Sequence, residues 1–158
     1  MEPRARSGRW RPAILLLVLL LGACAKLPPW RSFFGGTCAV TVRVDPGINQ
    51  NSPVPVEILL VYDAALLKKV SGMSAQDWFT GREQFLRDNP PGKGYEDWYW
   101  QWIPGQQVPD QYLSYRPLIQ GGVIFAGYYS PGMHRFQFLP FRDLAMELQA
   151  TDLKVAPP

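Results

Sequence analysis

The sequence has few of the residues on which metal and catalytic centres are usually built. Its 158 residues include two cysteines and one histidine, His134, which follows Pro131-Gly132 in a turn-forming segment. A metal centre needs several His, Cys, Asp or Glu ligands at suitable spacing, and a serine hydrolase needs a nucleophile with a base; neither pattern is present. We therefore predict no catalytic residue, no metal and no bound cofactor, and we expect His134 at the surface.

The sequence also lacks an apolar run long enough to cross a bilayer. Its longest run, Ala13–Leu21, falls well short of the roughly 20 residues that a spanning helix needs. Four basic residues precede this run: Arg4, Arg6, Arg9 and Arg11. A basic segment followed by a short apolar one is typical of a cleavable export leader.

The segment after the apolar run, Leu21-Gly22-Ala23-Cys24, resembles the lipobox of bacterial lipoproteins. The resemblance implies cleavage of residues 1–23, diacylglycerol on the Cys24 sulfur and an acyl chain on its amine. Several acyl chains make such an anchor stable, because one alone gives only marginal binding. Ala25 and Lys26 lack the aspartate that usually retains lipoproteins at the inner membrane. The implied location is therefore the outer membrane, facing the periplasm.

Without the leader, the chain has no excess of charge. The leader holds 4 of the 16 basic and 1 of the 13 acidic residues, so 12 of each remain. A neutral chain argues against a nucleic-acid partner, which requires a basic face. The remaining length suits one domain at 37–158, preceded by a lipidated tether at 24–36 that is rich in Pro and Gly.

Short apolar segments separated by turn formers indicate a mainly β fold. Six segments have strand character: 38–44, 54–62, 98–102, 121–129, 135–138 and 146–155. One helix is predicted from Ser74, with Asp77 completing a capping-box pattern, to Asn89. Repeated short strands with one helix predict a β-sandwich. Cys38, without a disulfide partner once Cys24 is lipidated, is expected to be a buried core thiol.

The loop between the first two strands, Asp45–Pro53, is longer than a tight hairpin and consists of turn formers. It is either a plain connection, which the local sequence favours slightly, or a binding loop. A second open question concerns Trp98, Trp100 and Trp102, which share one side of an extended chain. If these tryptophans are buried, they fill the core of the sandwich. If they are exposed beside Glu96, Asp97 and Asp110, they favour binding of carbohydrate or peptidoglycan, or a glycosidase.

The order of several motifs resembles the TssJ family, outer-membrane lipoproteins of the bacterial type VI secretion system. After the lipobox, the motifs that carry the resemblance are Ser52-Pro53-Val54, Ile58–Tyr62, Leu66-Leu67, Asp77-Trp78-Phe79, Pro104-Gly105-Gln106, Gly122–Tyr128 and a closing strand at 146–155. The resemblance implies a transthyretin-like two-sheet β-sandwich with one or two short helices and no activity of its own. It also implies that Leu66-Leu67 forms a turn before the helix.

The same resemblance implies an assembly role. The protein would bind the periplasmic domain of an inner-membrane partner in the type VI membrane complex. The contact would come from the loop between the first two strands, whose residues here are Pro46, Gly47, Ile48, Asn49, Gln50, Asn51 and Ser52. A pilotin-like lipoprotein of another secretion apparatus would share this location and stays an alternative.

Overall fold

The computed structural model describes residues 33–158. The leader, the lipobox with Cys24 and most of the tether lie outside the described residues. Within the part described, no helix is long and apolar enough to cross a membrane.

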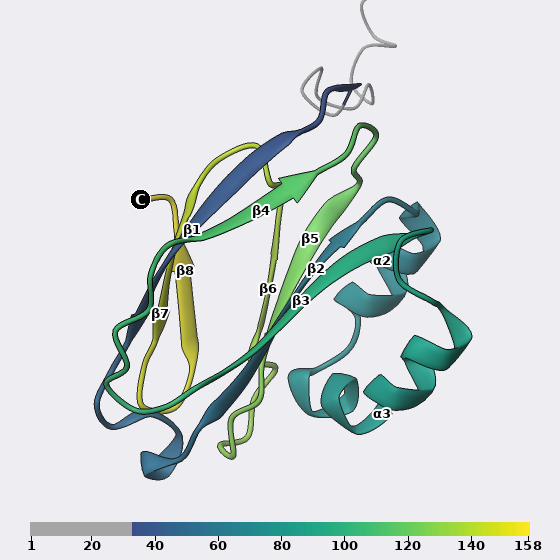
Figure 1. The fold of residues 1–158 in the computed structure, drawn as a ribbon. Coiled ribbons are helices and arrows are strands. Elements are labelled where there is room, and N and C mark those ends of the chain that lie inside the picture. Colours follow the sequence, from purple (N-terminus) through teal and green to yellow (C-terminus); the bar gives the residue numbers. More distant parts are fainter. Residues whose placement is uncertain (1–32) are drawn as a thin grey trace, which may run out of the picture. The chain divides into compact units, whose positions relative to one another are not determined.

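Eight strands in this part of the chain form two four-stranded sheets (Figure 1). The first sheet has the order β4-β1-β7-β8 and consists of β1 (Gly36–Val44), β4 (Gln111–Tyr115), β7 (Leu144–Leu148) and β8 (Leu153–Ala156). The second has the order β3-β2-β5-β6 and consists of β2 (Val54–Val61), β3 (Tyr95–Trp102), β5 (Gly121–Ala126) and β6 (Arg135–Phe138). Among these strands β1 and β7 pair in parallel, and the other pairs are antiparallel. The predicted two-sheet β-sandwich is confirmed.

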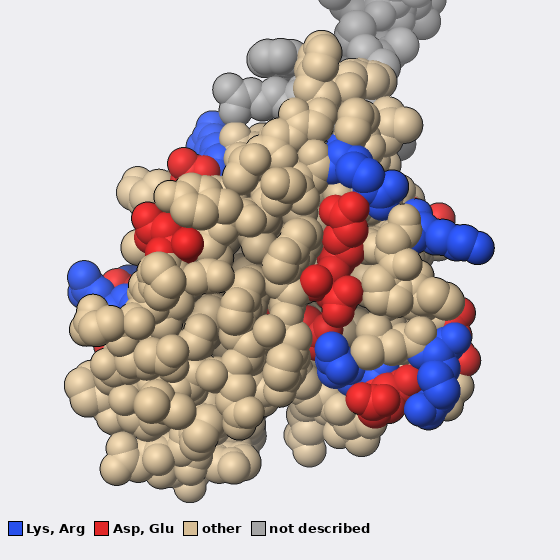
Figure 2. Space-filling view, viewed as in Figure 1, with Lys and Arg blue, Asp and Glu red and all other residues tan. Residues whose placement is uncertain are grey.

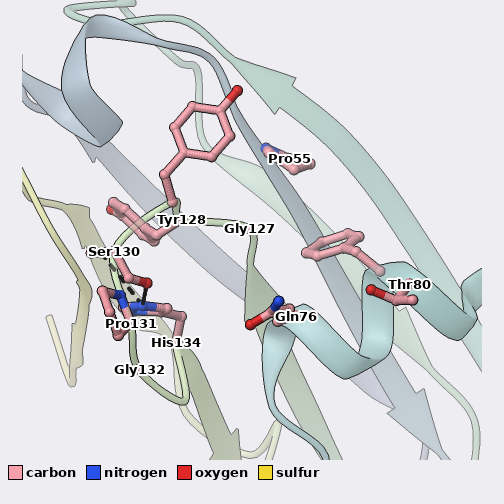
Figure 3. A pocket seen from close by; sticks show the side chains of 11 residues that line it. Pro55, Gln76, Thr80, Gly127, Tyr128, Ser130, Pro131, Gly132 and His134 are labelled. Atoms are coloured by element: carbon pink, nitrogen blue, oxygen red, sulfur yellow. Dashed lines mark hydrogen bonds between the residues drawn. The ribbon is translucent and has the colours of Figure 1, made fainter.

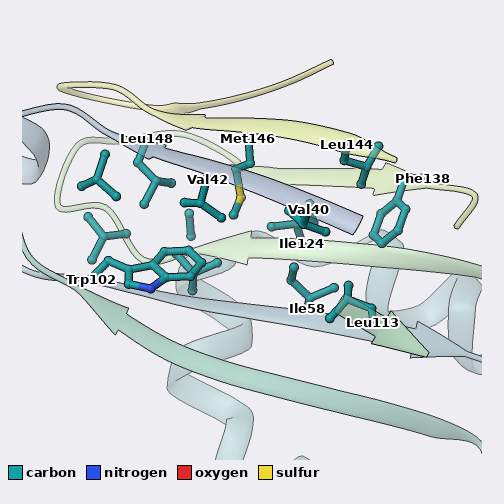
Figure 4. Packing of buried hydrophobic residues seen from close by; sticks show 14 of the residues in the cluster. Val40, Val42, Ile58, Trp102, Leu113, Ile124, Phe138, Leu144, Met146 and Leu148 are labelled. Carbon is teal, nitrogen blue, oxygen red and sulfur yellow. The ribbon is translucent and has the colours of Figure 1, made fainter. Parts of the chain in front are cut away.

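Alternate residues of β2 face two different cores. Val56, Ile58 and Leu60 pack between the sheets, where they meet apolar side chains from the first sheet, including Val40, Val42 and Met146 (Figure 4). Leu59 and Val61 point to the other side of the second sheet and join a separate cluster. Because successive strand residues point to opposite faces, β2 is buried on both sides and reads as a nearly continuous apolar run.

Two helices cover the outer face of the second sheet: α2 (Ala64–Ser71) and α3 (Ala75–Asp88) (Figure 1). The predicted capping box of α3 is confirmed, with Asp77 N–H donating to Ser74 Oγ at 3.0 Å and Ser74 N–H to Asp77 Oδ2 at 3.3 Å. The prediction of a turn at Leu66-Leu67 is wrong, because both residues lie in α2. Asp63 caps that helix by accepting a 2.7 Å bond from Leu66 N–H.

Two strand predictions need correction, and one strand was not predicted. The segment 146–155 is two strands, β7 and β8, joined by a turn that Gln149 N–H closes on Asp152 O at 3.0 Å. The strand predicted at 121–129 ends at Ala126. Strand β4 was not predicted, because only Leu113 of its five residues is buried and the segment does not alternate regularly between apolar and polar residues.

The three tryptophans of β3 face the main core, whereas Tyr99 is exposed on the opposite side. Trp102 is buried, and Trp98 and Trp100 are half-buried against the same cluster. The rings of Trp100 and Trp102 stack with centroids 5.4 Å apart. Of the two interpretations of this segment, the arrangement favours core packing over an open carbohydrate platform.

The strand register defines two ends of the domain. We call the end where the chain enters β1 the proximal end. Here the start of β1 lies beside the end of β4, since Gly36 pairs with Tyr115, and near the loops 116–120 and 139–143. We call the opposite end, where β1 finishes, the distal end. Here Val44 pairs with Leu148, so the loop 45–53 contacts the β7–β8 turn. The nine residues of β1 separate the two ends by about 30 Å.

A buried carboxylate lies under the helical layer. Glu57 is fully buried in β2, and its Oε2 accepts bonds from Trp78 Nε1 at 2.8 Å and Arg82 Nε at 2.7 Å. Burial raises the pKa of Glu57, and the two donors oppose this effect. Because the pKa is higher in the folded than in the unfolded chain, ionisation of Glu57 lowers stability as the pH rises through the interval between the two values.

We predict that Arg82→Ala lowers the free energy of unfolding by roughly 3 kcal/mol at neutral pH, because it leaves a buried carboxylate without its cation. Protonation of Glu57 removes that charge, so the loss should shrink as the pH is lowered. Urea unfolding over a pH series measures both effects. In a Glu57→Gln background the arginine change should cost much less; equal losses in both backgrounds would mean that Arg82 acts by packing alone.

Candidate functional site

The loop that the resemblance implicates forms a short 3-10 turn, Ile48–Asn51, at the distal end. Three consecutive residues have positive φ: Asn49 at 46°, Gln50 at 57° and Asn51 at 63°. Asn tolerates this left-handed region better than most residues, but three in a row is an unusual and strained backbone. Such strain persists only where surrounding contacts hold it.

Asn49 supplies the contacts that hold the loop. Its side chain is buried, with Nδ2 donating to Pro53 O at 3.1 Å and Oδ1 accepting from Tyr129 N–H at 2.7 Å. Its backbone N–H also donates to Ala150 O at 2.9 Å. Ile48 is fully buried as well. Both residues therefore face the domain, and the loop residues that can meet a partner are Pro46, Gly47, Gln50 and Asn51, with Ser52 half-buried.

His134 is buried, which corrects the prediction of a surface position. Its Nδ1 lies 2.9 Å from Asp152 Oδ1. Its Nε2 lies 2.7 Å from Ser130 O (Figure 3). Ser130 Oγ in turn donates to Thr151 O at 2.6 Å. These contacts fasten the β5–β6 loop to the β7–β8 turn, so three distal loops form one connected unit.

Ser130, His134 and Asp152 are the residue types of a hydrolase triad, but their bonds are wrong for that chemistry. Ser130 Oγ is 3.5 Å from His134 Nε2, whereas the Ser130 carbonyl oxygen is closer, at 2.7 Å. A ring nitrogen bonded to a carbonyl must carry a proton, so Nε2 cannot accept the serine proton. The cluster holds loops together.

A groove of about 520 Å³ runs between α3 and the β5–β6 loop (Figure 3). Its lining includes Pro55, Phe79, Tyr129 and Pro131 and contains no Asp, Glu, Lys or Arg. A Cβ on Gly127 would lie 2.6 Å from the Pro55 ring, so this close approach of loop and strand requires glycine. The groove extends the distal surface beyond the loop 45–53.

The distal surface is nearly free of charged side chains. The segments 46–53, 103–109 and 127–133 contain no Asp, Glu, Lys or Arg, and they expose Ile103, Tyr129 and Met133. Figure 2 shows the lower left of the molecule uniformly tan, with charged residues on the helical side and along the upper left edge. Exposed aromatic and Met side chains in a charge-poor surface are typical of the centre of a protein–protein interface.

The carboxylates considered for a glycosidase have other partners. Glu96 accepts bonds from Tyr62 Oη and Arg116 Nε, both at 2.8 Å, and Asp97 lies 3.9 Å from Arg82. Asp110 is exposed in a loop outside this cluster. No cluster of metal-ligating residues occurs within 33–158.

The prediction of Cys38 as a core thiol is confirmed. Its side chain is fully buried, and its Sγ donates to Arg142 O at 3.2 Å. Burial, with a smaller contribution from Asp143, raises the pKa of the thiol to about 11. The protonated form is therefore stable at neutral pH, and the thiolate needed for reactivity is scarce.

Comparison with solved structures identifies the fold, although no protein-family model and no curated protein matches the chain. Lip of Serratia marcescens, a membrane-bound component of the type VI secretion system, is 14% identical with a TM-score of 0.54, over 76% of this chain and 96% of Lip. The type VI secretion lipoprotein TssJ1 of Pseudomonas aeruginosa is 14% identical with a TM-score of 0.53, over 77% of this chain and 95% of TssJ1.

A third similar chain comes from the structure of the C-terminal domain of the type VI secretion protein TssM from EAEC. It is 16% identical with a TM-score of 0.53, over 77% of this chain and 98% of that one. The class that the fold defines is a two-sheet β-sandwich with a helical layer on one sheet. Its similar solved structures are TssJ lipoproteins, so the predicted resemblance is confirmed at the level of the fold.

We predict that Asn49→Ala lowers the free energy of unfolding by about 2 kcal/mol, because it leaves the Tyr129 N–H and the Pro53 carbonyl without their partner. Urea unfolding measures the change. Gln50→Ala is the matched control, since Gln50 shares the positive φ but is exposed, and it should change stability little. Equal small effects at both positions would contradict a structural role for Asn49.

Proposed function

We propose that this protein is a non-catalytic outer-membrane lipoprotein of the TssJ family and an assembly component of the type VI secretion membrane complex. The observation that carries the proposal is the match of its sandwich to Lip and TssJ1 over nearly their whole lengths. The motif order of the sequence supports the same assignment independently of the coordinates.

The anchor in this proposal is Cys24, carrying diacylglycerol and an N-acyl chain. The described chain enters the sandwich at the proximal end, through Gly36 of β1. A lipid attached before that point tethers the proximal end and leaves the distal end free to face away from the outer membrane. A distal surface about 30 Å further along β1 is therefore available to a partner in the periplasm.

The partner in this proposal is the periplasmic domain of an inner-membrane protein of the same machine. A similar chain in the structure of the TssM C-terminal domain supports a partner of this kind. The contact surface consists of Pro46, Gly47, Gln50, Asn51 and Ser52 together with the neighbouring Tyr129. Ile48 and Asn49 contribute by holding the loop in its strained shape, so that little conformational entropy is lost on binding.

We predict that Tyr129→Ala abolishes capture of the partner from detergent-solubilised envelopes and leaves the melting temperature unchanged, because this side chain is 68% exposed. Mass spectrometry identifies the captured proteins. Tyr112→Ala is a matched control, since Tyr112 is equally exposed but lies in β4, away from the distal loops, and it should keep capture intact.

Two results would count against this proposal. Equal capture by both tyrosine variants would remove the distal surface from the account. Capture of glycans or peptidoglycan fragments in place of an inner-membrane protein would favour the carbohydrate-binding alternative.

We also predict that the affinity for the partner changes little with ionic strength. The segments 46–53, 103–109 and 127–133 carry no Asp, Glu, Lys or Arg. Of the two carboxylates beside them, Asp45 and Asp152, the second is bonded to His134, so there are few charges for salt to screen. Titration of the purified partner domain at low and high sodium chloride measures this dependence. A steep loss of affinity with salt would assign the contact to the charged, helix-covered side of the domain.

A further inference from the structure

The proximal end exposes several large apolar side chains. Phe33 is 54% exposed before β1, Leu118 is 58% exposed in the β4–β5 loop, and Leu139 is 51% exposed in the β6–β7 loop. The tether and the β4–β5 loop lie against each other, because a Cβ on Gly35 would be 3.4 Å from the Pro117 ring. These apolar residues therefore surround the point where the chain enters the domain.

Leu118 has a backbone that does not favour leucine. Its φ is 66°, in the left-handed region that suits Gly or Asn, and its neighbour Ile119 is the residue that fills the core. Neither loop conformation nor core packing accounts for an exposed leucine here. An outlier of this kind points to a function of the side chain itself.

The loop that carries Leu118 is held on both sides. Arg116 N–H donates to Tyr62 Oη at 3.0 Å and Arg116 Nε to Glu96 at 2.8 Å, while Gln120 N–H donates to Val61 O at 2.8 Å. Leu118 therefore lies on a rigid loop that connects the two sheets.

The loop that carries Leu139 is fixed to β1. Asp143 Oδ1 accepts from Ala39 N–H at 2.9 Å, and Arg142 O accepts from the Cys38 thiol at 3.2 Å. Pro140, next to Leu139, is buried. Both leucines are therefore held outward by loops whose neighbouring residues are anchored in the domain.

The tether determines what lies closest to this surface. Cys24 precedes Gly36 by 12 residues, which span at most about 40 Å. A tether of this length keeps the proximal end at an effective concentration in the millimolar range next to the bilayer that holds the lipid. Weak apolar contacts are then sufficient to dock the domain.

We infer that the proximal end docks on the bilayer, with Leu118 and Leu139 entering the boundary between headgroups and acyl chains. The inference rests on the lipidation of Cys24 in the proposed function. Docking gives the domain a defined orientation, with the distal surface directed away from the outer membrane. Without docking, the domain would take up many orientations relative to the bilayer.

The test uses the lipidated protein, purified from bacterial membranes and reconstituted into vesicles of phosphatidylethanolamine and phosphatidylglycerol. The variants Leu118→Cys and Met133→Cys carry an environment-sensitive fluorophore. The two positions have similar exposure, 58% and 48%, but lie at opposite ends, and the buried Cys38 does not compete for the label. Thermal unfolding confirms that both labelled variants fold. Brominated lipids then quench any fluorophore that enters the bilayer.

We expect the label at residue 118 to lose most of its emission and the label at residue 133 to keep it, with Leu139→Cys behaving like Leu118→Cys. Vesicle flotation, run in parallel, reports the anchor itself. Flotation without quenching at residue 118 would overturn this inference alone, whereas absence of flotation would overturn both the inference and the proposed anchor. A blue shift at residue 118 that grows with protein concentration without lipid would assign the surface to a second copy and likewise overturn docking on the bilayer.

Discussion

Burial of both faces of the second sheet is the constraint on which the rest of the structure depends. Strands β2 and β5 place apolar residues on both sides, so one face must be covered by the first sheet and the other by α2 and α3. The one charge in this doubly buried layer, Glu57, is matched by Arg82 from the covering helix. With both faces of the second sheet occupied in this way, the surfaces left free are the outer face of the first sheet, the outside of the helical layer and the two ends of the sandwich, and the proposed function uses the two ends.

The two ends have different physical character, and the proposed function uses that difference. The distal loops are joined through buried polar residues, Asn49 and His134, whose bonds point inward and leave a rigid, charge-poor surface outside. The proximal loops are anchored in the domain as well, but they expose leucines beside the entry of the tether. The proposed lipid at one end and a preorganised loop cluster at the other suit a connector between a membrane and a protein assembly.

Local patterns in the sequence predicted most of the strands, the start of α3 at its capping box and the burial of Cys38. Features that depend on distant contacts could not be predicted. In the sequence Glu57 interrupts an apolar strand, and only the structure shows that Arg82, 25 residues later, is its partner. His134 lies in a turn-forming segment, and only the structure shows its contact with Asp152. The local sequence left the candidate loop open between a plain connection and a binding loop, and the resemblance decided for binding. Nothing in the local sequence distinguishes Asn49, which is buried, from Gln50, which is exposed.

The most direct test of the account is photo-crosslinking in living bacteria, with a photoreactive residue at Gln50 or at Leu118 of the full-length lipoprotein. The account predicts an adduct at residue 50 with an inner-membrane protein that has a periplasmic domain, and no such adduct at residue 118. An adduct with that protein at residue 118 and none at residue 50 would reverse the roles of the two ends and contradict the central claim.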